Sequence, residues 1–491
     1  MKRTINKFLC ILAVSVLFTA CKEDYLETSP TDAISSGTVF QTTNNGWAAI
    51  NGIHRALYIQ WLGNQDQGGH SANMIYSDMM GEDLVQTAQG NGWFNADYQW
   101  TAHRNVNSRT PYFSYYFYYR IIANANNIIN NIDNAEGPEA DKKAIKGQAL
   151  AYRSWCYFNL VQLFGKRYVA GQNNSQLGVP ILLVNTTEGQ PRATVEEVYA
   201  QAIEDIDAAI TNLQGYTRAH KSNINVNVAK GIKARIALTK GDWATAAQMA
   251  AEARQGFTLM SNAQYLQGFN DLDNPEWIWG IEQISDQQTY FYSFFAYMSA
   301  NFNSTNIRTN PKAINSRLYN QISATDVRKQ LWDPTGANTA FPIPPGGVRK
   351  PYMNRKFMAA SSSLSIGDLP LMRAGEMYLI EAEARARMGE NGPAQDALFT
   401  LVKNRDAAYI KSAATGQALI NEILLQRRIE LWGEGFRFQD LKRTNSPLDR
   451  TGGNHTQSLA LEMTVPADDV RWEFLIPQRE INANPAVEQN P

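Results

Sequence analysis

Cysteine is scarce in this chain, which has three in 491 residues: Cys10, Cys21 and Cys156. Cys10 lies inside an apolar run near the N-terminus and Cys21 directly follows that run, so Cys156 is the only cysteine in the rest of the sequence. A single thiol has no partner for an internal disulfide, so we expect packing alone to supply stability. Cys156 lies in an aromatic stretch, 152–158, which predicts a buried apolar role rather than a nucleophile.

The chain also has little net charge. Its 45 Lys and Arg and 46 Asp and Glu give a formal charge of -1, and no basic block stands out beyond the first few residues. This balance provides no positive field that would gather a polyanion, and it argues against nucleic-acid binding.

Signatures of catalysis are missing as well. Five histidines are scattered, with no two at metal-ligand spacing on a helix, and there is no Gly-x-Ser-x-Gly elbow or phosphate-binding loop. Glu204 and Asp205 fit the polar face of a helix, which predicts ordinary surface acids. Glu82 and Asp83 lie in an irregular segment, where a role as a catalytic acid pair is harder to exclude. A glycoside hydrolase needs two acids facing each other across a cleft, which sequence spacing does not establish. We therefore expect no enzyme, no metal site and no cofactor.

Aromatic residues, in contrast, are abundant: 11 Trp, 22 Tyr and 20 Phe. Tyrosine and tryptophan combine a flat apolar face with a polar edge, which suits burial with one side in contact with water. In a large helical chain most of them belong to the core, so the surplus in loop-like segments is what requires an explanation.

The N-terminus has the features of a secretory leader. Three basic residues precede the apolar segment 8–20, which is too short to span a bilayer permanently. Residues 17–21 (LFTAC) resemble the lipobox of bacterial lipoproteins, with Phe18 where Leu is usual. We expect residues 1–20 to be removed as a signal peptide and Cys21 to be lipidated, and 22–24 (KED) resembles an acidic signal for the outer face of the outer membrane. An ordinary secretory leader remains the alternative.

Helical periodicity accounts for much of the rest. After a polar spacer, 21–45, apolar residues at 3.6-residue spacing predict helices at 47–61, 112–132, 144–164, 194–213, 226–239, 243–255 and 421–431. Thr194 and Glu197 predict a capping box at the start of one of them. His54 lies on the apolar stripe of the first, where a satisfied interface histidine is more typical than a ligand.

Two helix pairs resemble tetratricopeptide repeats. Residues 234–250 place small residues where paired helices cross and Gly-Asp at the turn, and 378–401 is a looser copy. Such hairpins bury their apolar faces by stacking. We predict a mainly α domain over 46–491, a repeat-containing globule with tetratricopeptide-like helices near 113–255 and 371–443 and a few short strands.

Two long segments, 63–111 and 257–370, interrupt the helical pattern. The first carries Trp93, Tyr98 and Trp100; the second begins with a predicted short strand at 276–281 and then becomes rich in Tyr, Phe and Asn. Irregular segments of this length are usually functional or disordered, and large aromatic side chains argue against disorder. We call 63–111 the first excursion and 257–370 the second, and we expect both to bind ligand.

A charged segment lies near the C-terminus. Arg427, Arg428, Glu430 and Glu434 have the spacing of i, i+3 and i+4 neighbours along one helix. This pattern predicts local ion pairs in a structural network rather than a binding site.

The same segment carries a family resemblance. Residues 427–443 (RRIELWGEGFRFQDLKR) are similar to the signature of SusD/RagB-family outer-membrane nutrient-binding lipoproteins. The C-terminal stretch 474–491, the helix 377–384, the stretch 149–165 and the segment 21–26 also resemble that family. Together they extend the resemblance over essentially the whole mature chain.

The resemblance implies a function at the cell surface. It implies a lipid-anchored protein on the exterior of the outer membrane that captures a glycan and passes it to a SusC-like TonB-dependent transporter, over which it acts as a lid. A lipid tether would raise the effective concentration of weakly captured cargo beside the pore. A RagB-like peptide binder with the same transporter and a tetratricopeptide scaffold without a small ligand remain alternatives.

The resemblance also places recognition on loops outside the helical body. A sugar presents an apolar face ringed by hydroxyl groups, which matches a flat aromatic ring with a few polar side chains. The predicted ligand-binding residues are Trp93, Tyr98 and Trp100 in the first excursion and Tyr290, Tyr292, Asn301 and Asn303 in the second. The alternative is that each ring anchors its own loop. For the tyrosine-rich run 112–119, which lies mostly on a predicted helix, we expect core packing.

Overall fold

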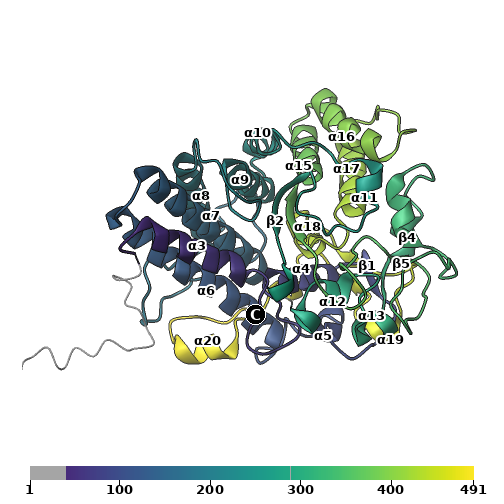
Figure 1. Cartoon of the computed structure of the whole chain (residues 1–491), viewed down its shortest axis with the longest axis horizontal. Helices are drawn as coiled ribbons and strands as arrows, with labels where there is room; N and C mark the ends of the chain where they lie inside the picture. The colour runs from purple at the N-terminus through teal and green to yellow at the C-terminus, as the bar shows by residue number, and fades with distance from the viewer. Residues whose placement is uncertain (1–39, 288) are drawn as a thin grey trace, which may run out of the picture.

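A computed structural model describes residues 40–287 and 289–491 (Figure 1). The predicted signal peptide, Cys21 and the spacer up to residue 39 lie outside the described residues. The described part is mainly helical with a few short strands, which confirms the predicted fold class.

The longer helices are α3 (Thr43–Ala56), α4 (His70–Met79), α6 (Arg109–Asn131), α7 (Glu139–Phe164), α8 (Val195–Asn212), α9 (Val226–Lys240), α10 (Trp243–Ala253), α15 (Ala374–Arg387), α16 (Asn391–Arg405) and α17 (Gly416–Glu430). The shorter ones are α5 (Asn95–Tyr98), α11 (Asn262–Tyr265), α12 (Phe295–Met298), α13 (Thr305–Thr309), α14 (Ser316–Tyr319), α18 (Arg437–Arg443), α19 (Gln457–Ala460) and α20 (Gln478–Ala483). The strands are β1 (Leu84–Gln86), β2 (Trp277–Ile281), β3 (Lys312–Ile314), β4 (Trp332–Asp333), β5 (Met353–Asn354), β6 (Leu369–Arg373), β7 (Leu448–Asp449) and β8 (Thr464–Val465).

The long helices form one packed array. Successive helices from α6 to α10 contact each other. Helix α10 also packs on α15, and α15 packs on both α16 and α17. The pairs α9–α10 and α15–α16 are the two tetratricopeptide-like pairs that the sequence predicts. They adjoin in space (Figure 1), although the second excursion separates them in the sequence.

Local sequence signals explain several helix ends. At α8 the capping box is confirmed: Glu197 N–H donates to Thr194 Oγ1 at 3.2 Å, and Thr194 N–H donates to Glu197 Oε2 at 2.8 Å. Helix α9 stops at Gly241, whose φ of 78° is left-handed and favours glycine. Asp242 then caps α10 by accepting from Thr245 N–H at 3.2 Å.

The first excursion contains a helix that the sequence does not predict. In α4 every residue except the first is buried, and a helix surrounded by protein on all sides needs no amphipathic period. The absence of a sustained period over 63–111 therefore did not mean irregular backbone throughout.

The two excursions share one small sheet with strand order β1-β3-β5-β4. Strand β1 of the first excursion pairs antiparallel with β3 of the second, with Val85 opposite Ala313. The predicted strand at 276–281 is confirmed as β2, which pairs antiparallel with β6, directly before α15.

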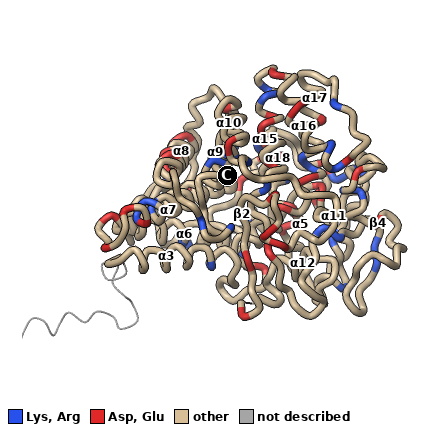
Figure 2. The backbone as a smooth tube through the Cα atoms, turned by 45° about the horizontal axis from the view of Figure 1, so that its top comes forward, with Lys and Arg blue, Asp and Glu red and all other residues tan. Residues whose placement is uncertain are grey.

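The charged C-terminal segment is a structural network, but its partners are not the local ones that the sequence predicts. Arg427 pairs with Asp440, and Arg428 pairs with Asp83. Glu430 accepts from Arg373 and Arg405, both at 3.0 Å. Figure 2 shows acidic and basic segments interleaved near α15 and α18. The network thus connects distant elements rather than successive helix turns.

Two further predictions about single residues are confirmed. Cys156 is buried, and burial raises the pKa of its thiol well above the usual range. His54 is buried with its Nδ1 2.5 Å from the Tyr152 hydroxyl, and burial lowers the pKa of its imidazole to about 3. Both side chains therefore stay uncharged in the core.

Candidate functional site

The two excursions meet where α5, α12 and α13 lie (Figure 1, lower right). The rings of Phe94 and Tyr297 are 4.7 Å apart. Asn310 Oδ1 accepts from the backbone N–H groups of Thr87 and Ala88 at 2.9 and 3.1 Å. Contacts between side chains, backbone and strands therefore hold the two segments together.

Trp93 contributes a half-buried ring to this region. The Arg109 guanidinium lies over the Trp93 ring at 4.8 Å from the centroid, a cation–π contact. Arg109 also pairs with Asp66 at 3.1 Å. Because Arg109 is the first residue of α6, this contact fixes the ring against the start of that helix.

Two buried carboxyl groups contact the first residues of α6, next to the Trp93 ring. Burial raises the pKa of Asp97 to about 7, and Thr110 Oγ1 donates to Asp97 Oδ1 at 2.7 Å. Burial also raises the pKa of Asp66, while the Arg109 guanidinium opposes that shift. Both side chains are buried, so they position Arg109 and the start of α6 rather than face a ligand.

The second excursion presents exposed rings. Tyr290 is 55% exposed and Phe291 is 46% exposed, whereas Tyr292 is half-buried. Their turn docks on the loop between α3 and α4: a side chain at Gly68 would collide with the Tyr292 carbonyl. Asp66, which holds Arg109 over Trp93, lies in the same loop. Trp93 and Tyr292 therefore approach one loop from two excursions.

Two of the predicted ligand-binding rings are core residues instead. Tyr98 is 1% exposed and its hydroxyl lies 2.5 Å from His455 Nδ1. Trp100 is 2% exposed, and its indole N–H donates to the Met80 carbonyl at 2.9 Å. Its ring is packed edge-on against Trp472 at 4.8 Å. Neither offers a free ring face, so each anchors its own segment.

Of the two predicted asparagines, Asn301 has a structural role and Asn303 is free at the surface. The Asn301 amide donates to the Ala359 carbonyl at 2.9 Å and accepts from the Ala359 N–H at 2.8 Å, so its side chain ties two parts of the second excursion together. Asn303 is exposed. Of the seven predicted residues, those with a surface-accessible side chain that no hydrogen bond ties to another segment are Trp93, Tyr290, Tyr292 and Asn303.

Sequence reasoning missed two neighbours of these residues. Phe291 lies between the two predicted tyrosines, and its aromatic character was the available signal. Arg109 gave no signal, because its contact with Trp93 depends on how the first excursion folds back on α6.

The acid pair in the first excursion is neutralised. Arg437 Nη2 lies 2.5 Å from Glu82, and Arg428 Nη2 lies 2.6 Å from Asp83. Both carboxylates are buried. They belong to the ion-pair network rather than to an open pair of acids.

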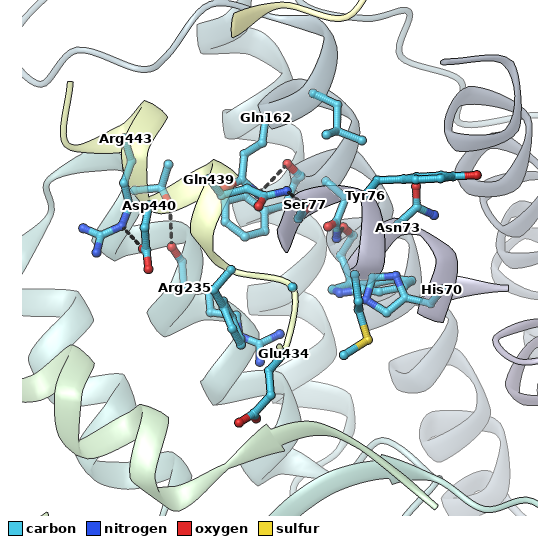
Figure 3. Close-up of a pocket in the computed structure, with 18 of the residues that line it drawn as sticks. His70, Asn73, Tyr76, Ser77, Gln162, Arg235, Glu434, Gln439, Asp440 and Arg443 are labelled. Carbon is cyan, nitrogen blue, oxygen red and sulfur yellow. Dashed lines mark hydrogen bonds and ion pairs between the residues drawn. The ribbon is translucent and has the colours of Figure 1, made fainter. Parts of the chain in front are cut away.

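Figure 3 shows a pocket of about 80 Å³ between α4, α9 and α18, lined by His70, Asn73, Arg235 and Gln439 among others. Burial lowers the pKa of His70 to about 3. Within the described residues, Asn73 Nδ2 and Arg427 Nη1 have no hydrogen-bond partner. The volume is below the roughly 300 Å³ of small-molecule sites, and these donors fit ordered water.

Residues 40–287 and 289–491 contain neither a candidate membrane-spanning helix nor a candidate metal-binding cluster. None of the helices there combines the length and apolar character needed to cross a bilayer. In the same residues, no group of three or more His, Cys, Asp or Glu has an arrangement that would hold a metal ion.

Comparisons with known proteins place this geometry in a wider context. A family model described as the SusD family matches residues 250–491. A second model, described as starch-binding and associating with the outer membrane, matches residues 24–238.

Curated relatives match along most of their length. A SusD-like protein P38 of Formosa agariphila is 23% identical over 98% of this chain and 97% of its own. A SusD-like protein of Bacteroides ovatus is 21% identical over 89% of this chain and 82% of its own.

Solved structures share the fold. A SusD-like carbohydrate binding protein from Bacteroides vulgatus is 27% identical, with a TM-score of 0.80 over 91% of this chain and 98% of its own. A SusD superfamily protein from Bacteroides thetaiotaomicron has a TM-score of 0.78 at 24% identity, over 92% of this chain and 100% of its own.

Proposed function

The chain belongs to the SusD/RagB family, and from this premise we propose that it is a cell-surface glycan-binding lipoprotein. It captures an oligosaccharide or polysaccharide and delivers it to a partner SusC-like TonB-dependent outer-membrane transporter. It binds its cargo without cleaving it.

The single observation that supports glycan capture best is the group of accessible rings where the excursions meet. Tyr290 and Phe291 are exposed, and the Trp93 ring is held in place by Arg109. Flat rings match the C–H face of a sugar, while Arg109 and the exposed Asn303 offer hydrogen bonds to its hydroxyl groups.

The anchor in this proposal is the lipid on Cys21, after removal of residues 1–20, on the exterior of the outer membrane. The matching family description, which refers to association with the outer membrane, supports this location. A tethered binder beside a transporter gains from effective concentration, so a modest affinity for each glycan is sufficient.

Binding to a panel of polysaccharides tests the proposal. The mature chain, with Cys21→Ser to omit the lipid, is titrated by calorimetry beside a Trp93→Ala/Tyr290→Ala/Tyr292→Ala variant. We expect at least about a tenfold loss of affinity, because truncating central contact residues commonly costs more than 1 kcal/mol. Phe399→Ala is the matched control, since Phe399 is a half-buried ring on α16, away from α12.

The other outcomes separate the alternatives. Binding of peptides but not polysaccharides would indicate a RagB-like cargo, and binding of neither would favour a scaffold. A rise in reducing ends during the assay would contradict the non-enzymatic function. Co-purification of the lipidated protein with a large barrel protein tests the transporter partnership.

A further inference from the structure

Helix α6 carries tyrosines on an accessible face, which differs from the core packing expected for the run 112–119. Phe113 and Phe117 are buried, but Tyr112, Tyr116 and Tyr119 are only half-buried. With Arg109 they occupy positions i, i+3, i+7 and i+10, which follow one stripe of a helix. The aromatic run therefore has two faces, one in the core and one at the surface.

An open groove of about 360 Å³ lies beside this stripe. Tyr112, Tyr116 and Tyr119 form one wall, and Gln190, Arg479 and Glu480 contribute to the other. Helix α20, which carries Arg479 and Glu480, lies near α6 in Figure 1. The volume falls within the usual range of small-molecule sites, roughly 300–1,000 Å³.

Polar side chains that line the groove can form hydrogen bonds with a ligand. Tyr115 is buried and lines the groove, and its hydroxyl lies close to Tyr119 and Glu480. Arg479 is exposed; its guanidinium lies 4.5 Å from the centroid of the Tyr112 ring and donates to the Tyr112 hydroxyl at 3.1 Å. Thr187 also lines the groove and is exposed, so its hydroxyl and the Arg479 guanidinium offer hydrogen bonds to a hydroxylated ligand.

The groove is connected to the Trp93 region by a series of contacts. The rings of Tyr112 and Tyr116 stack at 5.8 Å, and Trp61 meets Tyr116 edge-on at 5.7 Å. The backbone N–H of Trp61 donates to the Gln67 carbonyl at 2.9 Å, in the loop that also carries Asp66. Along α6, the ten steps from residue 109 to residue 119 give a rise of about 15 Å.

We propose that the groove between α6 and α20 is a second carbohydrate subsite, continuous along α6 with the Trp93 site. This inference rests on the proposed function and adds to it: the protein selects chains long enough to occupy both subsites at once.

A second open groove provides a contrast. It has a volume of about 430 Å³ and is lined by charged side chains that include Lys166, Arg167, Asp468 and Asp469. Its one aromatic lining residue, Trp472, is buried and packed on Trp100. The α6 groove differs by having several accessible rings, which suit a neutral hydroxylated ligand better than a charged one.

The test compares chain lengths. The polysaccharide that binds in the panel above is partially hydrolysed, and oligosaccharides of increasing length are titrated into the unsubstituted protein and three variants. These are Tyr112→Ala/Tyr116→Ala, the exposed single variant Arg479→Ala, and Trp93→Ala. Thermal melting checks that each is folded, and Arg479→Ala keeps the test valid if the double variant is not.

We expect the groove variants to lower affinity for long oligosaccharides at least threefold and to leave affinity for the shortest binding ones unchanged. Trp93→Ala should lower affinity at every length. Unchanged affinity at all lengths in the folded groove variants would overturn the second subsite while the proposed function stood. An equal loss at all lengths would also overturn it, since it would indicate an indirect structural effect. If no polysaccharide bound at all, the proposed function itself would fail.

Discussion

A ring's function in this protein depends on what covers its two faces. Trp93 and Trp100 are close in sequence and were equal candidates. The Trp100 ring is enclosed by Trp472 and Phe438, whereas Trp93 is held by one guanidinium at the edge of the core. Tyr290 has no such cover and is more than half exposed. Residue type alone therefore does not separate an anchor from a platform.

The raised pKa of Asp97, a buried carboxyl group near the candidate site, can be tested by substitution. Its folded-state pKa of about 7 is above the ordinary 3.8, so its contribution to stability is fully present below pH 3.8 and is lost as the pH rises through 7. Asp97→Asn removes that titration while an amide oxygen still accepts from Thr110. We expect the variant to gain up to about 4 kcal/mol relative to the parent between pH 4 and pH 8.

Urea denaturation at both pH values measures this difference. Asp286→Asn is the control, because Asp286 is exposed in the second excursion. Parallel pH profiles for the parent and Asp97→Asn would contradict a buried carboxyl with a raised pKa.

Charged side chains from other elements meet at the C-terminal end of helix α17. Arg405 on α16, Arg373 at the end of β6 and Arg328 all reach Glu430 at the end of α17. Glu276, just before β2, shares Arg373 and Arg405 with it. The network therefore joins the helical array to the second excursion, and the arginines hold the pKa of Glu430 well below its usual range.

Breaking this network should be costly. Glu430→Gln leaves three buried arginines without one of their counter-charges, and we expect a loss of about 3–5 kcal/mol in the free energy of unfolding. Chemical denaturation at pH 7 measures it. Glu390→Gln is the control, because its pair with Arg385 is partly exposed and such pairs contribute at most about 1 kcal/mol. Equal effects of the two substitutions would contradict a special role for the buried network.

The molecule as a whole combines a regular helical array with two segments that fold against each other. The second excursion leaves the array after α10 and returns to it at α15, which packs on α10. The array therefore fixes both ends of the long insertion, and the β1–β3 pairing joins it to the first excursion. Such support keeps exposed rings in a fixed place, which limits the entropy lost when a ligand binds.

Global stability should not depend on disulfides. In the chain without its first 21 residues, Cys156 is the single thiol, and it is buried on α7. We expect a thiol reagent to label it only as fast as the molecule unfolds, and a reductant to leave the melting temperature unchanged. Labelling kinetics across a urea series measure this. Rapid labelling in native buffer would contradict a closed core around α7.

Much of the scaffold was predictable from local signals. The capping box at Thr194, the Gly241 stop and the apolar stripes are all short-range features, and the structure confirms them. The buried helix α4 was not predictable in the same way, since complete burial removes the period. In the candidate site, the sequence placed Tyr290 correctly at the surface but gave no reason to separate it from Tyr98.

By itself, the sequence determined the mainly helical scaffold and the family, because periodicity, capping and motif spacing act over a few residues. The tertiary structure alone decided which rings stay accessible, which charges pair across α17, and that the tyrosine stripe of α6 borders a groove with α20. Those outcomes depend on contacts between residues far apart in the chain, and no local pattern encodes them.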